Sequence, residues 1–293
     1  MTNKPKQVYT ESEKSSPMLI VRLLRDRSGG IGLFLVLSFA CISLLGLFEI
    51  TPYPVLEQHP ISRLQAPSSD FWFGTDQFGR DIFSRVMRGG ANSLQVAVLS
   101  VSISSLLGTV IGILAGYVGG LLDTVLMRLM DILFAFPSLL LALLIVTIIG
   151  PGLSSTVLAI TVVYTPIFAR VARGPVLSLK NAEFVTAARC LGAQDWRIIL
   201  RHVFPNMQTV LIVQFTLALS WALITEAGLS FLGLGTQPPD PSWGLMLSEN
   251  RGLAEIAPWL ILFPGLSIML TVLGFNLLGD GLRDMLDPHL RAE

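Results

Sequence analysis

Two long stretches of this chain carry no charged side chain, and they restrict its fold more than any other feature. The first lies between Arg88 and Asp123, and the second runs from Ile132 to Ala169. A helix needs about 20 apolar residues to cross the hydrocarbon core of a bilayer, so the first stretch has room for one span and the second for two. Charged residues make up only 14% of the chain, where soluble domains have about a quarter. The sequence therefore predicts an integral membrane protein.

Six membrane spans are predicted in all, which gives an all-α integral membrane fold. The uncharged runs lie at 31–48, 94–116, the two halves of 132–169 on either side of a Gly-Pro-Gly break, 204–225 and 256–279. No small-residue cleavage site follows the first run, so it is interpreted as an uncleaved span rather than a secretory signal. The predicted order is a tail at 1–27, the first helix at 28–49, a loop at 50–91, a core of membrane helices at 92–286 and a tail at 287–293.

The distribution of basic residues predicts the orientation of these spans. Of the 20 lysines and arginines, 15 fall in segments on the side of the N-terminus and 5 on the opposite side. Positive residues concentrate on the cytoplasmic side of membrane proteins, so both termini are expected in the cytoplasm and the loop at 50–91 outside. The formal net charge is zero, which offers nucleic acid no basic surface. Neither the two cysteines nor the three scattered histidines form a metal-binding pattern.

The segment Glu183–Pro205 is the longest amphipathic stretch that carries charges, and it falls on the cytoplasmic side. Its pattern predicts two short helices joined at Gly192, which supplies a left-handed turn. Asn181 is the expected N-cap of the first helix, and Asp195 that of the second. The first helix is expected to place on one face Phe184, Ala187, Ala188 and Leu191, and the second Trp196, Ile199, Leu200 and Val203. Pro205 then ends the second helix or begins the next.

This segment is similar to the cytoplasmic EAA loop of ABC-importer permeases, in which Glu-Ala-Ala, Gly and a final Leu-Pro recur at fixed spacing. Ala187, Ala188, Gly192 and Pro205 keep that register, whereas Thr186, His202 and Phe204 depart from it. The resemblance implies that a loop at about 173–205 couples the membrane helices to an ATPase. A pair of interfacial helices resting on lipid headgroups is the alternative interpretation. The expected coupling residues are Glu183, Phe184, Ala187, Ala188, Leu191, Gly192, Asp195, Trp196 and Pro205.

The loop before the second span carries charges of alternating sign in Gly74-Thr75-Asp76-Gln77-Phe78-Gly79-Arg80-Asp81, followed by Arg85. Alternation of this kind favours a compact, salt-bridged cap over the membrane face. The run resembles a signature of the C-type permease in dipeptide, oligopeptide and nickel ABC importers. Later stretches agree with the same family, among them 131–137, 226–235, 241–244 and 277–284. The resemblance covers nearly everything from about Arg22 onward, and it implies the six-helix type I importer fold.

The resemblance also implies contacts outside the chain. Asp76, Arg80, Asp81, Arg85 and Trp243 are expected to face an extracytoplasmic substrate-binding protein, although a folded loop without a ligand and a headgroup anchor for Trp243 remain alternatives. Glu226 is a possible pathway residue, or else a helix-end carboxylate paired with a neighbouring chain. The implied partners are a related B-type permease, two ABC ATPase subunits and membrane lipid. The implied location is the bacterial cytoplasmic membrane.

The sequence carries no phosphate-binding loop of the form GxxxxGK[ST] and no nucleophile constellation. The chain is therefore predicted not to be an enzyme and to need no cofactor, with ATP and Mg²⁺ bound by partner subunits. Di- or oligopeptides are the expected substrates, and nickel chelates, glutathione and opine- or sugar-like solutes are alternatives. A proton-coupled carrier and an intramembrane enzyme are the alternatives from other classes. The first would carry ionisable residues in mid-span, and the second would carry paired catalytic groups there.

Overall fold

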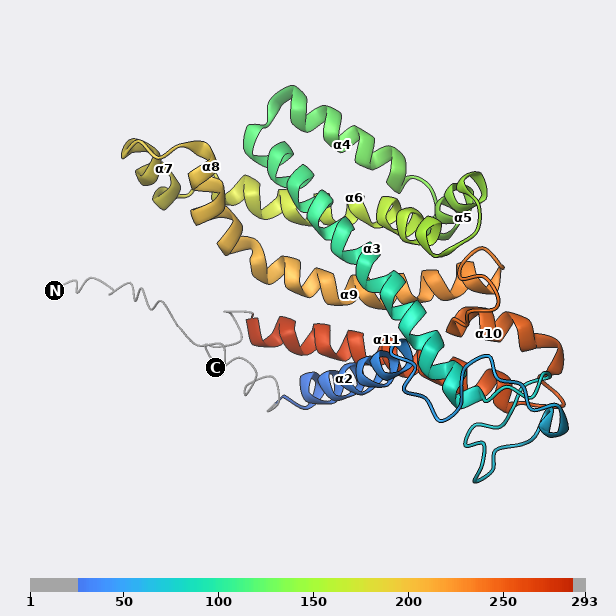
Figure 1. Ribbon diagram of the computed structural model, residues 1–293. Coiled ribbons are helices and arrows are strands. Elements are labelled where there is room, and N and C mark those ends of the chain that lie inside the picture. Colours follow the sequence, from blue (N-terminus) through green and yellow to red (C-terminus); the bar gives the residue numbers. More distant parts are fainter. Residues whose placement is uncertain (1–25, 287–293) are drawn as a thin grey trace.

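The computed structural model describes residues 26–286, and this part of the chain is helical throughout, apart from turns, loops and one isolated β-bridge. The elements are α2 (Arg27–Leu47), η1 (Pro60–Ser62), α3 (Ile82–Val118), α4 (Gly120–Phe134), α5 (Ser138–Ile149), α6 (Leu153–Leu179), α7 (Glu183–Cys190), α8 (Asp195–Ile198), η2 (Ile199–Val203), α9 (Phe204–Phe231), α10 (Trp243–Asn250), η3 (Arg251–Leu253) and α11 (Trp259–Leu286). Figure 1 shows α3 crossing α6 and α9, with α2 and α11 side by side below them. The helices α7 and α8 mark one end of the bundle, here the elbow end, and the loops around α10 mark the other, the cap end.

Glycines allow the closest helix contacts in the bundle. A Cβ on Gly108 of α3 would come within 2.6 Å of the Thr165 carbonyl oxygen on α6, and one on Gly32 of α2 within 2.8 Å of the Gly274 carbonyl oxygen on α11. Small residues let the backbones of membrane helices approach one another in this way. The tightly packed α3–α6 pair forms the centre of the fold, and α9 lies against both of its helices.

Five helices are long and apolar enough to cross a bilayer, and a sixth span results if α4 and α5 are counted together. The six predicted spans agree with this arrangement, but the third differs in detail. It bends by 90° between α4 and α5 instead of running straight through Pro137. Pro137 occupies the N-cap position of α5, where its missing N–H group costs no helical hydrogen bond. Pro137 therefore marks a break within the third span.

The elbow end runs directly into the membrane helix that follows it. α8, η2 and α9 form one helical run from Asp195 to Phe231, and η2 is a single π-helical turn within it. Pro205 lies in the first turn of α9, a position that tolerates proline. Of the two roles expected for Pro205, the structure shows the second, the start of the next helix.

Candidate functional sites at the elbow and the cap

The elbow, defined here as residues 183–205, consists of α7 and α8 with a sharp glycine turn between them. Gly192 has φ +83°, a left-handed conformation that only glycine adopts without steric cost. No atom lies within 4 Å of the position that a Cβ on this residue would take. The role of Gly192 is therefore conformational, as the sequence predicts, and the turn does not depend on tight packing.

The helix caps of the elbow differ from the prediction. Ala182 and Gln194 occupy the two N-cap positions, and neither side chain makes a capping hydrogen bond. Asp195 lies one residue further along, in the first turn of α8, where a carboxylate suits the helix dipole. The Asp195 carboxylate instead accepts a hydrogen bond of 2.6 Å from the Tyr117 hydroxyl, at the end of α3. The expected roles of Asn181 and Asp195 as caps are thus wrong.

The elbow exposes large apolar side chains, although the Phe184 ring lies 6.2 Å from the His202 ring and the Trp196 indole N–H donates to Gln194 at 2.6 Å. Leu191 is 89% exposed, Trp196 57% and Phe184 44%. Of the remaining expected coupling residues, Ala188 is half-buried, and the exposed ones are Glu183, Ala187, Gly192, Asp195 and Pro205. Soluble surfaces seldom carry such a cluster without a use, and a protein partner is the usual reason.

Three fully buried side chains fix the elbow to the bundle. They are Val185 of α7, Ile198 of α8 and Val203 of η2. The sequence pattern placed Val203 on one face with Trp196 and Leu200, but these two point outward and Val203 points inward. The π-helical turn at 199–203 adds a residue to the helical repeat and so rotates the faces relative to a regular helix.

Tyr117 is a candidate functional residue that the sequence analysis did not identify. Besides donating to Asp195, its hydroxyl accepts a hydrogen bond of 3.2 Å from Arg189 of α7. This bond raises the pKa of the Arg189 guanidinium, which therefore stays charged. A tyrosine at the end of a span is normally interpreted as a headgroup anchor, and that was the only local signal available. The structure shows that it joins α3 to both helices of the elbow.

Two basic side chains, one in α6 and one just after it, strengthen the same end of the bundle. The Arg173 guanidinium donates two hydrogen bonds of 2.7 Å to Asp123 of α4. Beyond the last turn of α6, Lys180 donates a hydrogen bond of 2.7 Å to the Gly116 carbonyl of α3. Bidentate pairs of the Arg173 kind hold a fixed geometry, so α3, α4, α6 and the elbow share one polar framework.

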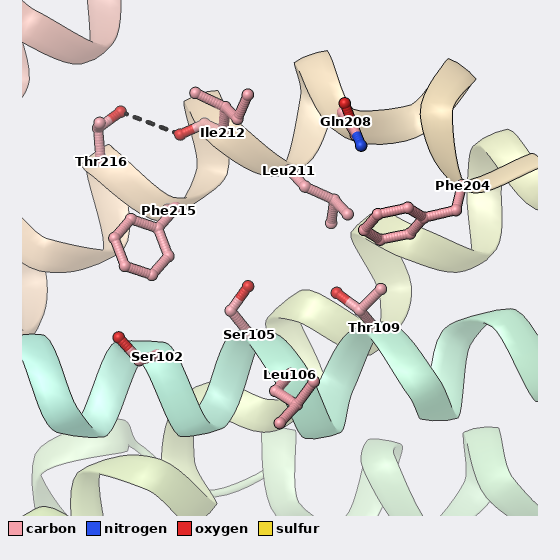
Figure 2. A pocket seen from close by; sticks show the side chains of 10 residues that line it. All are labelled: Ser102, Ser105, Leu106, Thr109, Phe204, Gln208, Leu211, Ile212, Phe215 and Thr216. Carbon is pink, nitrogen blue, oxygen red and sulfur yellow. Dashed lines mark hydrogen bonds between the residues drawn. The ribbon is translucent and has the colours of Figure 1, made fainter. Parts of the chain in front are cut away.

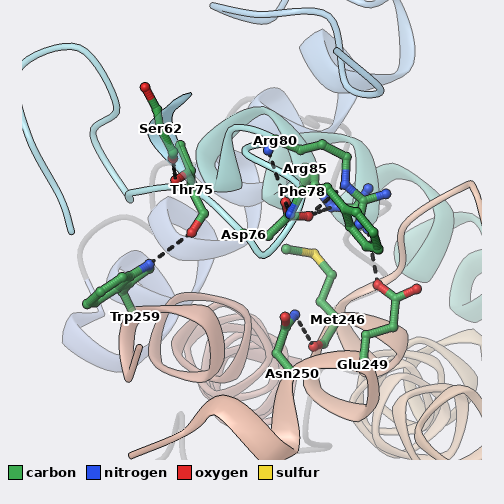
Figure 3. A network of polar contacts seen from close by, with 10 residues as sticks. All are labelled: Ser62, Thr75, Asp76, Phe78, Arg80, Arg85, Met246, Glu249, Asn250 and Trp259. Carbon is green, nitrogen blue, oxygen red and sulfur yellow. Dashed lines mark hydrogen bonds and ion pairs between the residues drawn. The ribbon is translucent and has the colours of Figure 1, made fainter. Parts of the chain in front are cut away.

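The cap is defined here as residues 48–81 and 232–258, and a polar network joins its two segments to the start of α3 (Figure 3). Asp76 accepts a hydrogen bond of 2.6 Å from the Arg80 side chain, and its carboxylate lies 3.9 Å from Arg85. Arg85 also donates to Glu249 of α10 at 3.3 Å. Alternating charges therefore do form the salt-bridged cap that the sequence predicts.

Most of the expected contact residues at this end are interior residues. Asp76, Asp81 and Arg85 are only 2%, 3% and 2% exposed, and Trp243 is 1% exposed. The Trp243 indole N–H donates to the Val86 carbonyl oxygen at 2.9 Å. These four side chains hold the cap together and do not reach a partner, which corrects the expected surface role. Of the five, Arg80 alone is half-buried and keeps an accessible edge.

Glu226 is also placed differently from the expectation. It is fully buried in α9, and one carboxyl oxygen accepts a hydrogen bond of 2.7 Å from the Ser230 hydroxyl one turn further on. A side chain without accessible surface does not line a pathway in this conformation. The carboxyl group has its partner within α9, whereas the alternative interpretation expected one on a neighbouring chain. Among the described residues, no group of three or more potential ligands could hold a metal ion.

A groove of about 500 Å³ opens between α3 and α9 (Figure 2). Ser102, Ser105 and Thr109 of α3 face the aromatic rings of Phe204 and Phe215 across it. Small hydroxyl side chains among apolar ones are typical of surfaces where membrane helices pack. The groove is a feature of the bundle surface, and among its lining residues Phe204 belongs to the elbow.

The fold and the elbow define a class, the multi-pass membrane permease. The family model described as "Binding-protein-dependent transport system inner membrane component" matches residues 108–292, and the chain belongs to this family of ABC-importer permeases. The inward-facing MetNI methionine ABC transporter shares its fold, with a TM-score of 0.58 at 18% identity over 69% of this chain and 96% of that chain. The fold is thus that of a type I importer.

Curated relatives agree over nearly the full length. The dipeptide transport system permease protein DppC of Alkalihalophilus pseudofirmus is 46% identical over 92% of this chain and 89% of the relative. The glutathione transport system permease protein GsiD of Pectobacterium atrosepticum is 46% identical over 89% of this chain and 86% of the relative. A putative peptide transport system permease protein of Brucella suis is 43% identical, and the match covers 95% of this chain and 94% of the relative.

Proposed function

We propose that this permease subunit imports di- or oligopeptides that an external binding protein delivers. The permeases named for dipeptide and peptide transport, each above 40% identity over about nine-tenths of the chain, support a peptide substrate. Glutathione is the second candidate, because a permease named for its transport is equally similar. Glutathione is itself a short peptide, so both candidates share amide groups and free carboxylates.

The coupling step of this proposal rests on the elbow. Its exposed apolar side chains, Phe184, Leu191 and Trp196, are the docking surface for an ATPase subunit. The run from Asp195 to Phe231 is one continuous helix, so a displacement of α8 is passed on to α9 without an intervening hinge. ATP-driven closure of the ATPases then shifts the membrane helices between two states, provided that the elbow binds the open and closed ATPases with different affinities.

The remaining parts of the assembly follow the same proposal. The chain pairs with a related, non-identical B-type permease, the partner that its resemblance to C-type permeases implies. Two ATPase subunits bind ATP and Mg²⁺, and this chain catalyses no reaction. Both termini lie in the cytoplasm, so the elbow faces the ATPases and the cap faces the binding protein.

A charge placed on the elbow tests the docking surface. Leu191→Asp adds a carboxylate at the most exposed apolar position of the elbow, whereas Leu121→Asp adds one at an 80% exposed position at the same end of the bundle but outside the elbow. In the purified full complex, Leu191→Asp is expected to abolish co-purification of the ATPase and ATP-driven uptake of labelled dialanine. Leu121→Asp is expected to preserve both, and a Leu191→Asp complex that assembles and transports normally contradicts the proposal.

A further inference from the structure

A second cavity lies between the bent α4–α5 span and the helices α6 and α9, on a different face of α9 from the groove in Figure 2. Its volume is about 390 Å³, within the usual range for small-ligand sites. Gln214 and Trp221 of α9 line it together with Tyr164 of α6 and Ser138 of α5. We call it the α6–α9 pocket, and no residue of it belongs to the elbow or the cap.

Two polar side chains of this pocket lie deep in the membrane without a hydrogen-bond partner among the described residues. Gln214 lies ten residues after the start of α9 and Trp221 ten residues before its end, in a helix of 28 residues. At 1.5 Å per residue each side chain is about 15 Å from the nearer helix end, well inside a hydrocarbon core of about 30 Å. Neither the Gln214 amide nor the Trp221 indole N–H has a hydrogen-bond partner in the described part of the chain. Exposure of such groups to lipid is costly.

Side chains in the α3–α9 groove do not face the same problem. Serine and threonine hydroxyls can donate to the carbonyl one turn back on their own helix, as Thr216 does to Val213 at 2.9 Å. Gln208, the amide in that groove, is only four residues from the start of α9 and so lies near the membrane surface. The side chains of Gln214 and Trp221, at mid-depth, have no such hydrogen bond within their own helix. The α6–α9 pocket therefore needs a polar occupant to pair with them, and the groove does not.

The floor of the pocket is held rigid by a chain of hydrogen bonds. The Thr225 hydroxyl donates to the Trp221 carbonyl oxygen at 2.9 Å, which uses its only proton. The Tyr164 hydroxyl, 3.2 Å from the Thr225 oxygen, must then be the donor of that bond. These bonds link α6 to the backbone of α9 at Trp221, a residue that is 62% exposed.

The pocket offers neutral polar groups and no unpaired charge. The charged groups nearest in sequence to its lining, Arg170 and Asp131, pair with each other at 2.7 Å, and the Arg170 guanidinium lies 4.1 Å from the centre of the Phe134 ring. An amide that donates and accepts, beside an indole that donates, complements the backbone amides of a peptide. A metal ion would lack an opposite charge in this site.

We propose that the α6–α9 pocket is a substrate-contact site on the translocation route, where backbone amides of the transported peptide meet Gln214 and Trp221. The inference rests on the proposed peptide uptake and names the residues that take part in it. The binding protein delivers the substrate and so sets the apparent affinity of uptake. Contacts in the pocket therefore affect the maximal rate of uptake rather than its KM. Contacts that lower the barrier for a polar substrate at mid-depth raise the maximal rate.

Uptake by the full importer in proteoliposomes tests the site, with dialanine and trialanine as probes. Gln214→Leu and Trp221→Phe are each expected to lower the maximal uptake rate about fivefold, the effect of losing one neutral hydrogen bond, and to leave the KM of uptake and the ATP hydrolysis unchanged. Gln214→Asn keeps an amide and is expected to recover most of the rate. Gln208→Leu, on the same helix but in the other groove, is the matched control. Equal rates for Gln214→Leu and the wild type overturn the proposal.

Water access gives a second measurement that does not depend on transport. In a chain with Cys41→Ser and Cys190→Ser, which removes both cysteines, Gln214→Cys is expected to react with a water-soluble methanethiosulfonate, and dialanine under turnover is expected to slow the reaction. Leu37→Cys, 55% exposed in the middle of α2, is expected to stay unreactive. An unreactive Gln214→Cys means that the amide packs on the partner permease, and the site proposal is then wrong. Failure of the wild type to take up either peptide counts instead against the proposed function.

Discussion

Tyr117 joins two parts of the chain that are far apart in sequence. Its hydroxyl bonds Asp195, 78 residues further on, and Arg189, 72 residues further on. Buried anchors such as Ile198 hold the elbow by apolar contact, which tolerates sliding, whereas a hydrogen bond fixes distance and direction. A displacement of the elbow reaches α9 through the continuous helix, and Tyr117 is the side chain best placed to pass it to α3 as well.

Removal of this hydroxyl is expected to loosen the coupling between ATP hydrolysis and transport. Tyr117→Phe keeps the ring but loses both hydrogen bonds, so nothing fixes the distance between α3 and the elbow helices at this point. In proteoliposomes we expect ATP hydrolysis to continue while the peptide taken up per ATP falls severalfold. Tyr53→Phe, which removes a tyrosine hydroxyl at the cap, is the control and is expected to leave this ratio unchanged. Equal ratios for Tyr117→Phe and the wild type would show that α3 follows the elbow without this bond.

Local sequence patterns predict which side chains form ion pairs, but they do not predict which of those side chains are buried. The alternating charges around Asp76 predicted a salt-bridged cap, and the structure contains one. Nothing in the sequence showed that Arg85 and Trp243 lie inside it, because their burial depends on α10, more than 150 residues after Arg85. Tyr117 and Gln214 were missed for the same reason. Each looks like an isolated polar residue in an apolar run until the partner helix is known.

At the scale of elements, the apolar runs predicted the membrane helices, and Gly192 predicted the turn of the elbow. Gly192→Ala is expected to weaken coupling, because a Cβ at φ +83° costs about 1–2 kcal/mol even where space is open. Gly174→Ala is a matched control, since Gly174 lies within α6 and also has nothing within 4 Å of a Cβ. We expect ATPase co-purification and uptake to fall for Gly192→Ala, to recover for Gly192→Asn and to be unaffected by Gly174→Ala. The same loss in both alanine variants would contradict a conformational role.

The 90° bend of the third span was beyond sequence reasoning. A proline in a membrane helix produces a tolerated kink in some contexts and a full break in others, and the surrounding helices decide which. Pro166 and Pro175 lie inside α6 without interrupting it, while Pro137 separates α4 from α5. All three positions hold proline, so the residue type alone does not predict which of them breaks the helix. The α6–α9 pocket borders this bend, so it too could be found only in the folded chain.

At the scale of the whole molecule, every proposal above requires the elbow and the cap to lie on opposite sides of the membrane, with the elbow inside. The structure separates the two ends of the bundle (Figure 1). The sequence predicts that 15 of the 20 basic residues lie on the same side of the membrane as the elbow. In a chain freed of both cysteines, Gln58→Cys and Gln194→Cys place one exposed thiol at each end. A membrane-impermeant maleimide on intact spheroplasts is expected to label Gln58→Cys only, because the bilayer shields the cytoplasmic end. Permeabilised cells should label both. Reaction of Gln194→Cys in intact spheroplasts would put the docking surface on the side that has no ATP, and coupling through the elbow could not then operate.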